Sequence, residues 1–430
     1  MPETMSILDE LDARGLFANC TDRAALAELL ATNAPVSIYA GYDPTSASLH
    51  VGNLVPTIML KRMQLAGHRP VIVVGGATGM IGDPSGKSDE RNLLDDATLQ
   101  ANLAGIRSQL SRLLDFESPS IGALMTNNAD WTRGVSFLEF LRDIGKYLTI
   151  NYMMAKDSVK SRLEGDNGIS YTEVSYMLLQ AFDFVELARP PINCRVQVGG
   201  NDQYGNITAG TELQRKLGRP QLFGLTAPLL LDSTGQKMGK TSTGERIWLD
   251  AERTLPFEFY QYWFTRTDEE APRLVKMFSL RPLAELDELL AAHDQDRAKR
   301  MAQRELARAM TAWVHGDAAV EQVEWANQVF TTGTLDGLSP DELARLAKTI
   351  PTVDIPRADL TAGISIVDLI AATVAKSKTE ARTKIQQGGA YVNNVRVQDI
   401  KHTVTLDQFA AQLLLLVRGG KKDLRLVRAI

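Results

Sequence analysis

The sequence predicts an α/β protein in which a parallel β-sheet covered by helices is followed by a helical region and then by a small α+β module. Three observations predict this order. Short apolar runs alternate with helical patterns through residue 249, the pattern from 251 to 346 is helical, and the tail carries its own helix and hairpin signals. Of the 430 residues, 44% are hydrophobic and 23% are charged, which excludes a disordered or fibrous chain.

Sequence features also exclude several classes of protein. The segment from Met1 to Glu10 is acidic and has no apolar stretch, so we expect no secretory signal. No apolar run is long enough to span a membrane. Cys20 and Cys194 provide neither a disulfide framework nor a zinc-binding cluster. We therefore expect a cytoplasmic enzyme or binding protein that has no membrane partner and no dedicated metal ligands.

The net charge of −5 hides a difference between the body and the tail of the chain. Residues 362–430 hold 11 basic and 5 acidic side chains, whereas the preceding residues hold 36 basic and 47 acidic ones. A basic module on an acidic body is typical of a protein that contacts RNA locally. A chance excess of charge on a solvated face explains the same numbers equally well, so charge alone leaves both interpretations open.

The first half of the chain predicts strand–helix–strand units. Its expected elements, in order, are a strand over 35–40, a loop over 41–49, a helix over 52–66, a strand over 70–74, a helix over 171–187 and a strand over 195–198. Gly67 ends the first helix, and paired glycines follow the last two strands. Such units build parallel sheets whose ligand sites lie at the carboxyl ends of the strands.

The tail has a separate plan. Pro351 and Pro356 indicate a linker. The elements expected after it are a helix over 364–374, a helix opened by a capping box of Ser377 and Glu380 and ended at Gly388-Gly389, and a hairpin over 391–397 that turns at Asn393-Asn394. These patterns divide the chain into residues 1–249, 250–350, 351–361 and 362–430.

The segment from Tyr39 to Asn53 predicts a phosphate site. A strand ends there and a helix begins at Gly52, and helix N-termini present free backbone N–H groups to anions. Gly41 and Gly52 let a ring or a phosphate approach the backbone, while Thr45 and His50 have side chains that donate to phosphate oxygens. A lone histidine in a loop is usually only a surface residue, but this one directly precedes a helix start, which favours a functional role.

A second glycine-rich segment runs from Gly75 to Arg91. Asp83 suits a cationic amine, and Lys87 and Arg91 suit a departing phosphate. The spacing of the glycines, lysine and serine does not match a Walker A loop. A turn with solvated charges is the alternative, and this segment alone does not exclude it.

Residues 171–187 are apolar almost all round and predict a buried helix. Tyr176, Gln180 and Asp183 are its polar exceptions, at positions i, i+4 and i+7. At about 100° per residue they fall on one stripe roughly 60° wide. Because buried polar groups need partners, the stripe indicates a small polar ligand, although neighbouring protein groups would satisfy it equally well.

Two later segments add polar residues at strand and loop ends. Asp202 and Gln203 follow the strand over 195–198, where Asp202 suits ribose hydroxyls and Gln203 suits a polar ligand group. Lys237 and Lys240 lie three residues apart in a polar stretch, and such a pair suits charge that arises only in a transition state. Lysine pairs on loops are usually solvated, so this motif is weak alone.

Taken together and in this order, the segments resemble the class I aminoacyl-tRNA synthetases, and most closely the bacterial tyrosyl members. His50-Val51-Gly52-Asn53 is similar to the family's HIGH signature, and residues 237–241 are similar to its KMSKS loop. The tail resembles a small RNA-binding module first known from a ribosomal protein. The resemblance implies a Rossmann-like parallel-sheet catalytic domain, an α-helical anticodon-binding domain and a small α+β RNA-binding domain.

The resemblance also implies an activity and partners. The activity is that of a tyrosine–tRNA ligase. ATP with Mg²⁺ activates L-tyrosine to tyrosyl-adenylate, and the tyrosyl group then passes to the 3′-terminal ribose of tRNA(Tyr). A homodimer is implied as well.

Site residues of the family carry over onto matching positions of this chain. The catalytic set, which contacts the phosphates, is Thr45, His50, Lys87, Arg91, Lys237, Lys240 and Thr241. The tyrosine-binding set is Tyr39 and Asp183 for the phenolic hydroxyl, Asp83, Tyr176 and Gln180 for the amino group, and Gln203 near the carboxylate. The ATP-binding set is Gly41, Gly52, Asn53, Asp202 and Lys240.

Positions 40 and 53 depart from the family pattern. Asn53 replaces the second histidine of the signature and keeps hydrogen bonding without a charge, while Ala40 stands where relatives often have Cys, which removes a ribose contact.

Three other functions compete. A tryptophanyl enzyme fits Tyr39 and Asp183 less well, and a nucleotidylyltransferase needs no RNA-binding tail. An RNA-binding protein on an inactive synthetase body has no need to keep His50 and both loop lysines.

Overall fold

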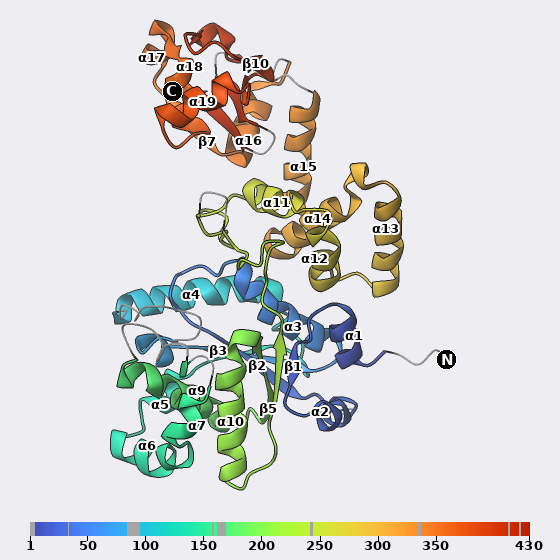
Figure 1. Ribbon diagram of the computed structural model, residues 1–430, viewed down its shortest axis with the longest axis vertical. Coiled ribbons are helices and arrows are strands. Elements are labelled where there is room, and N and C mark those ends of the chain that lie inside the picture. The colour runs from blue at the N-terminus through green and yellow to red at the C-terminus, as the bar shows by residue number, and fades with distance from the viewer. Residues whose placement is uncertain are drawn as a thin grey trace. The chain divides into compact units, whose positions relative to one another are not determined.

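The computed structural model describes residues 5–32, 34–83, 95–156, 159–160, 169–240, 244–332, 335, 337–411, 413–420 and 423–430 (Figure 1). The chain forms two compact units, Met1–Leu249 with Pro272–Ala291, and Asp250–Ala271 with Ala292–Ile430. The first is an α/β unit with a parallel sheet, and the second joins helices to a small α+β region, which confirms the predicted fold class. Within the described residues, no helix is both long and apolar enough to cross a bilayer.

The first unit is built on a sheet of strand order β1-β6-β5-β2-β3-β4. Its strands are β1 (Asn19–Cys20), β2 (Ser37–Tyr42), β3 (Arg69–Val74), β4 (Leu124–Asn127), β5 (Cys194–Gly200) and β6 (Phe223–Ala227). β1 runs antiparallel to β6, and the other neighbouring pairs run parallel. The expected strands are β2, β3 and β5. However, β2 includes Gly41 and Tyr42, expected in a loop, because they pair with Val73 and Val74 of β3.

Helices cover both faces of this sheet (Figure 1). They are α1 (Ile7–Ala13), α2 (Arg23–Leu30), α3 (Leu54–Leu65), α4 (Asp96–Leu113), α5 (Ala129–Thr132), α6 (Phe137–Asp143), α7 (Ile150–Met154), α9 (Tyr171–Leu187) and α10 (Tyr204–Lys216), with short 3₁₀ turns η1 (Val51–Asn53), η2 (Thr78–Met80), η3 (Gly145–Tyr147) and η4 (Asn201–Gln203). Residues three apart in a strand face opposite sides. Tyr42 accordingly meets Thr57 of α3 through a 2.9 Å hydroxyl hydrogen bond, whereas the Tyr39 ring lies 5.0 Å from that of Phe184 in α9.

The strand order reverses beside β2. β3 and β4 continue the sheet on one side of β2, and β5 and β6 continue it on the other. In open α/β sheets this reversal leaves a crevice at the carboxyl ends of the strands, where ligands bind. The fold therefore places any ligand site at the ends of β2 and β5.

Helix α9 begins and ends where the sequence predicts. A capping box starts it: the Ser170 hydroxyl accepts from the Glu173 N–H at 3.2 Å, and the Glu173 carboxylate accepts from the Ser170 N–H at 3.1 Å. Phe184 and Val185 are fully buried. This anchoring fixes the direction in which the polar stripe of the helix faces.

The chain after the sheet is helical, as expected. Its helices are α11 (Pro256–Phe264), α12 (Glu270–Phe278), α13 (Leu283–Gln295), α14 (Met301–His315), α15 (Asp317–Thr332) and α16 (Pro340–Thr349), with η5 (Arg297–Lys299). We expected one domain over 250–350, but Pro272–Ala291 belongs to the first unit. One reason is Arg14, directly after α1, whose buried guanidinium donates to the carbonyl oxygens of Ser279 and Arg281 at 3.1 and 2.8 Å.

The C-terminal region contains a sheet of order β10-β9-β12-β13-β7. Its elements are β7 (Thr352–Ile355), α17 (Arg357–Ala362), β8 (Ile364–Ser365), α18 (Ile366–Thr373), α19 (Lys378–Gln386), β9 (Ala390–Val392), β10 (Val395–Val397), β11 (Thr403–Val404), η6 (Leu406–Gln408), β12 (Leu414–Gly419) and β13 (Asp423–Ala429). The linker expected over 351–361 is wrong. β7 pairs with β13, and Leu360 of α17 is fully buried in the core. Pro351 and Pro356 flank this strand, positions that a sheet tolerates.

The predicted tail motifs otherwise form. The Ser377 hydroxyl accepts from the Glu380 N–H at 3.2 Å and starts α19, although Glu380 itself reaches the backbone N–H of Lys376. Asn393 and Asn394 both have positive φ, 45° and 61°, as the tight turn of a two-residue hairpin requires. The hairpin of β9 and β10 is therefore confirmed.

Candidate active site

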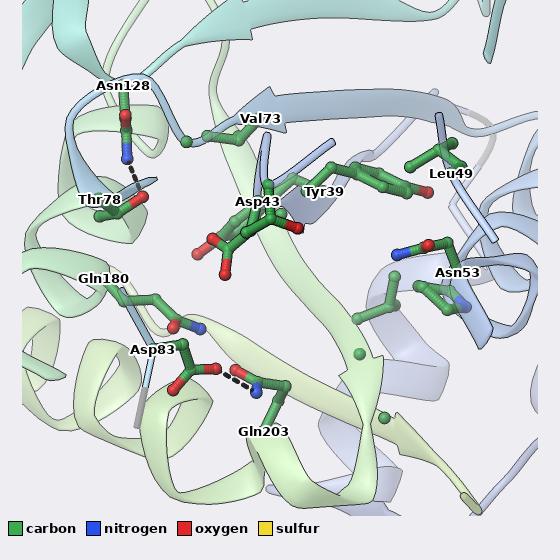
Figure 2. A pocket seen from close by; sticks show the side chains of 18 of the residues that line it. Tyr39, Asp43, Leu49, Asn53, Val73, Thr78, Asp83, Asn128, Gln180 and Gln203 are labelled. Carbon is green, nitrogen blue, oxygen red and sulfur yellow. Dashed lines mark hydrogen bonds between the residues drawn. The ribbon is translucent and has the colours of Figure 1, made fainter. Parts of the chain in front are cut away.

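A cavity of about 240 Å³ lies at the carboxyl ends of β2 and β5, against α9 (Figure 2). The structure brings around it the predicted residues Tyr39, Gly41, Thr45, His50, Asn53, Asp83, Tyr176, Gln180, Asp183 and Gln203. Side chains far apart in the sequence thus meet at the reversal of strand order. All of them belong to the first unit.

Asp183 is the most deeply held carboxylate of the cavity, with 4% of its surface exposed. Its two oxygens accept hydrogen bonds from Asn128 Nδ2 at 2.9 Å and from Trp131 Nε1 at 2.8 Å. Burial raises the pKa of Asp183 to about 7, although both hydrogen bonds act in the opposite direction. The carboxyl is thus oriented by two donors and keeps lone pairs for a ligand.

Three buried polar atoms around the cavity have no hydrogen-bond partner in the described part of the chain. They are the Tyr39 hydroxyl, Gln180 Oε1 and Gln197 Oε1. Burial, with a smaller contribution from the nearby charge of Asp183, raises the pKa of Tyr39 well above its usual value, so the hydroxyl stays protonated. Protein groups donate hydrogen bonds to both oxygens of Asp183, but no described protein group donates to Gln180 Oε1. Because buried polar atoms are normally paired, the cavity is built for a polar ligand.

Carboxylates surround the end of the cavity near α9 and α10. Asp83 Oδ2 accepts from Gln203 Nε2 at 2.7 Å (Figure 2). The Tyr176 hydroxyl donates to Asp43 Oδ1 at 3.4 Å. With Asp183, the lining therefore includes three acidic side chains, an arrangement that favours a ligand carrying a cationic amine.

His50 is the N-cap of η1 and also lines the cavity. The ring atom Nδ1 accepts from the Gly52 N–H at 3.0 Å, and the backbone N–H of His50 donates to Asn53 Oδ1 at 3.0 Å. Burial, followed by the positive charge of Arg246, lowers the pKa of His50 to about 4. The imidazole is thus neutral near pH 7, and since Nδ1 accepts, Nε2 carries the proton and is the donor available to a ligand.

The glycines of this segment act differently from one another. A Cβ at Gly52 would lie 2.8 Å from Cε1 of the His50 ring, so the missing side chain makes room for the cap, and Gly52 does not line the cavity. A Cβ at Gly41 would meet no atom within 4 Å. Of the two close approaches that we expected, only the one at Gly41 is open to a ligand.

The loop that carries Lys237 and Lys240 contributes neither lysine to the cavity lining. Lys237 Nζ forms an ion pair with Asp202 Oδ2 at 3.1 Å, and neither these residues nor Lys240 line the cavity. Lys237 and Lys240 are exposed. The predicted residues Lys87, Arg91 and Thr241 lie outside the described residues.

Several lining or supporting residues escaped the sequence analysis. Asn128 donates to Thr78 Oγ1 at 2.8 Å (Figure 2). It also donates to Asp183, and its Oδ1 accepts from the Ala77 N–H at 2.7 Å. Gln197 of β5 lies directly opposite Tyr39 of β2. No local pattern marks Asn128. Gln197, however, stands at the start of the polar segment ending at Gln203, and its place on a predicted strand beside the site was a usable signal.

Family models match nearly the whole chain. Residues 31–331 match the model described as tRNA synthetases class I (W and Y), and residues 342–427 match the tyrosine--tRNA ligase SYY-like C-terminal domain. The tyrosine--tRNA ligase of Rhodopirellula baltica is 46% identical over 427 residues, covering 99% of this chain and 97% of that protein. The tyrosine--tRNA ligase of Opitutus terrae is 47% identical over 429 residues, covering 99% and 100%.

Solved structures agree with these matches. The crystal structure of a C-terminally truncated mitochondrial tyrosyl-tRNA synthetase of Aspergillus nidulans is similar with a TM-score of 0.69 and 31% identity, covering 76% of this chain and 95% of that one. A tryptophanyl-tRNA synthetase of Encephalitozoon cuniculi shares the fold, with a TM-score of 0.52 and 15% identity over 78% of this chain and 90% of that one. The chain therefore belongs to the tyrosine–tRNA ligase family of the class I tRNA synthetases.

Proposed function

We propose that this protein is a tyrosine–tRNA ligase that activates L-tyrosine with ATP and transfers the tyrosyl group to the 3′-terminal ribose of tRNA(Tyr). One observation carries the proposal: the hydroxyl of Tyr39, which has no hydrogen-bond partner among the described residues, lies in the same cavity as the carboxyl of Asp183. Such a pair complements an aromatic alcohol, whose hydroxyl both donates and accepts a hydrogen bond. Full-length relatives that are tyrosine--tRNA ligases support the same conclusion.

Tyrosine binds with its phenol toward Asp183 and its ammonium toward the acidic end. The phenolic O–H donates to Asp183, and Tyr39 donates to the phenolic oxygen. The ammonium donates to Asp83 and to the unpaired Oε1 of Gln180, with Tyr176 and Gln203 completing this end. Phenylalanine lacks the hydroxyl, so the Tyr39 hydroxyl stays unpaired and the remaining lone pairs of Asp183 receive no donor from the ligand, which rejects phenylalanine. Tyrosyl-tRNA synthetases are themselves the established example of this kind of discrimination.

Activation needs no protein nucleophile, because the substrate brings its own. A carboxylate oxygen of tyrosine bonds to the α-phosphorus of ATP, the bond from that phosphorus to the bridging oxygen breaks, and the electron pair leaves with pyrophosphate. The protein aligns the groups and neutralises charge. Neutral His50 and Thr45 donate to phosphate oxygens, Lys237 and Lys240 act from their loop, and Lys87, Arg91 and Thr241 complete the set by resemblance.

Nucleotide, metal and RNA partners follow from the same family. Asn53, Asp202 and the open backbone at Gly41 contact the ribose and base. Mg²⁺ accompanies ATP as part of the substrate. The helices within 250–350 contact the anticodon, and the basic residues of 362–430 contact the variable arm of tRNA.

A homodimer and a cytoplasmic location complete the proposal. Large apolar side chains are exposed on neighbouring elements of the first unit: Phe137 and Leu138 of α6 are 64% and 76% exposed, and Ile150 of α7 is 58% exposed. Scattered single apolar residues are ordinary on a surface, but a group of them is typical of a protein interface. This patch is where the second copy of the chain packs.

Exchange of labelled pyrophosphate into ATP tests the proposal. Exchange should depend on tyrosine and should be far weaker with phenylalanine or tryptophan. The purified protein should then charge tRNA(Tyr), and a preparation cut short of the C-terminal region should still form adenylate but lose charging. RNA binding without tyrosine-dependent exchange would instead identify an RNA-binding protein on an inactive synthetase body.

A further inference from the structure

Residues 246–249 join the two signature segments of the first unit. The Ile247 carbonyl accepts from the Val51 N–H at 3.1 Å, and the Leu249 N–H donates to the Leu49 carbonyl at 2.9 Å. On its other edge, the Ile247 N–H donates to the Gly239 carbonyl at 2.9 Å. This short antiparallel arrangement pairs Trp248 with His50 and Arg246 with Lys240.

The pairing sets which side chains share a face. Successive residues of an extended chain face opposite sides, and directly paired residues face the same side. Arg246 and Trp248 therefore share one face with their partners His50 and Lys240. Ile247 and Leu249, each 3% exposed, occupy the buried face. The face shared by Arg246, Trp248 and His50 is part of the cavity lining.

Arg246 carries a charge that nothing in the described part of the chain neutralises through a hydrogen bond or an ion pair. Its guanidinium carbon lies 5.7 Å from the centre of the Trp248 ring. The three acidic residues of the lining are engaged elsewhere: Asp183 with Asn128 and Trp131, Asp83 with Gln203, and Asp43 with Tyr176. Its charge does reach His50, whose pKa it helps to lower.

The chemistry of this cation suits a phosphate. A guanidinium is always charged, and its planar set of donors matches phosphate oxygens in a bidentate manner. His50 beside it offers a neutral N–H donor. Stacking on Trp248 holds the long side chain near the cavity at a smaller loss of entropy on binding. A cation in this position repels the ammonium group of tyrosine but attracts the triphosphate of ATP.

We propose that Arg246 is a further catalytic residue, which binds the phosphates of ATP at the His50 end of the cavity and stabilises the negative charge that collects on departing pyrophosphate. This inference rests on the proposed function, because it takes ATP as the second substrate. It adds a phosphate contact outside both signature motifs. Because His50 pairs with Trp248 and Lys240 pairs with Arg246, the short strand holds this contact beside both motifs.

Steady-state pyrophosphate exchange with Arg246→Ala, Arg246→Lys and Arg215→Ala tests the assignment. Arg215 is a matched control, an exposed arginine in the last turn of α10 that forms an ion pair with Glu212. Arg246→Ala should lower kcat/KM for ATP by about 10²-fold, the usual loss for one transition-state donor. Arg246→Lys should recover part of that loss, and Arg215→Ala should match the wild type. Tyrosine affinity and Tm should stay unchanged in all three variants.

Competition by adenosine separates phosphate binding from a structural role. Adenosine lacks the phosphates, so its inhibition constant should be the same in Arg246→Ala and in the wild type. Activity within twofold of the wild type, or equal losses for ATP, adenosine and tyrosine, would overturn the proposal. If the wild type itself shows no tyrosine-dependent exchange, the proposed function fails; if the wild type and Arg246→Ala are equally active, only the role of Arg246 fails.

Discussion

The proposed tyrosine end and the proposed phosphate end of the site differ in how much is assembled before a ligand arrives. At the tyrosine end, Asp183 on α9 and Asn128 directly after β4 are buried and hydrogen-bonded to each other. At the phosphate end, Lys237 and Lys240 are exposed on a loop and do not line the cavity. The residues that we propose for tyrosine recognition are thus part of the packed fold, whereas two of the proposed phosphate-binding lysines lie outside the cavity lining.

This difference follows from the two tasks. A pocket that rejects a wrong amino acid must hold its donors and acceptors within a few tenths of an ångström, which packed helices and strands do best. Cations that neutralise a leaving group act only when ATP is bound, so they do not need to be packed in place in the protein without ATP. Four experiments test this difference between the two ends.

The largest effect is expected from Asp183→Ala. The variant removes the proposed acceptor of the phenolic hydroxyl and leaves Asn128 and Trp131 without the carboxylate that they contact, so tyrosine affinity should fall by about 10³-fold while the protein remains folded. Equilibrium dialysis with tyrosine and far-UV circular dichroism measure the two outcomes. Ser175→Ala, on the same helix, is the control and should bind tyrosine normally. Unchanged affinity in Asp183→Ala would remove this residue from the pocket.

A pH effect of comparable size is expected in the ligand-free protein. Burial raises the pKa of Asp183 from 3.8 to about 7, so the folded state keeps a proton that the unfolded state releases. The stability from Asp183 is complete below about pH 4 and is lost as pH rises to about 7, by at most about 4 kcal/mol. Urea unfolding at several pH values measures this loss.

Asp183→Asn cannot ionise and should lose this component of the pH dependence, even if its stability is lower throughout. Identical pH profiles for the variant and the wild type would contradict the burial argument.

Lys237→Ala should act on chemistry alone. Loss of one cation that stabilises pyrophosphate should lower kcat for activation by about 10²-fold, while tyrosine affinity stays the same. Tm should also hold, because an exposed pair such as Lys237 with Asp202 contributes less than about 1 kcal/mol. Lys299→Ala, which breaks a similar exposed pair with Asp296, is the control. Weaker tyrosine binding in Lys237→Ala would erase the contrast between the two ends.

Asn128→Ala should have the smallest effect, and an informative one. Asn128 positions Asp183 without being predicted to touch tyrosine, so its loss should raise KM for tyrosine about tenfold and leave KM for ATP unchanged. Stopped-flow or exchange kinetics with each substrate varied in turn separate the two constants. Equal changes in both constants would indicate a general loss of structure rather than a role at the tyrosine end.

Much of the site follows from local pattern. The helix over 171–187 and its polar stripe depend on residues three and four apart, so Tyr176, Gln180 and Asp183 share a face as soon as the helix forms. The turn at Asn393-Asn394 is equally local, because its geometry depends on two backbone conformations. Such features are visible in a sequence because neighbouring residues decide them.

Other residues depend on contacts between distant segments. Gln197 meets the site only through its pairing with Tyr39, and Arg246 only because its strand pairs with the segment of His50. The supposed linker over 351–361 fails for the same reason: β7 becomes a strand by pairing with β13, more than 70 residues later in the chain. Prolines that looked like breaks merely mark the ends of that strand.

By itself, the amino-acid sequence determined the bounds of α9, the hairpin turn at Asn393-Asn394, the candidate site residues and the family to which the chain belongs, because these depend on neighbouring residues and on the order of motifs. Only the tertiary structure decided that Asn128 and Trp131 orient Asp183, that His50 is neutral, and that Arg246 stands beside it. These depend on burial and on strand register. Desolvation and pairing are properties of the packed chain, so no short stretch of sequence contains them.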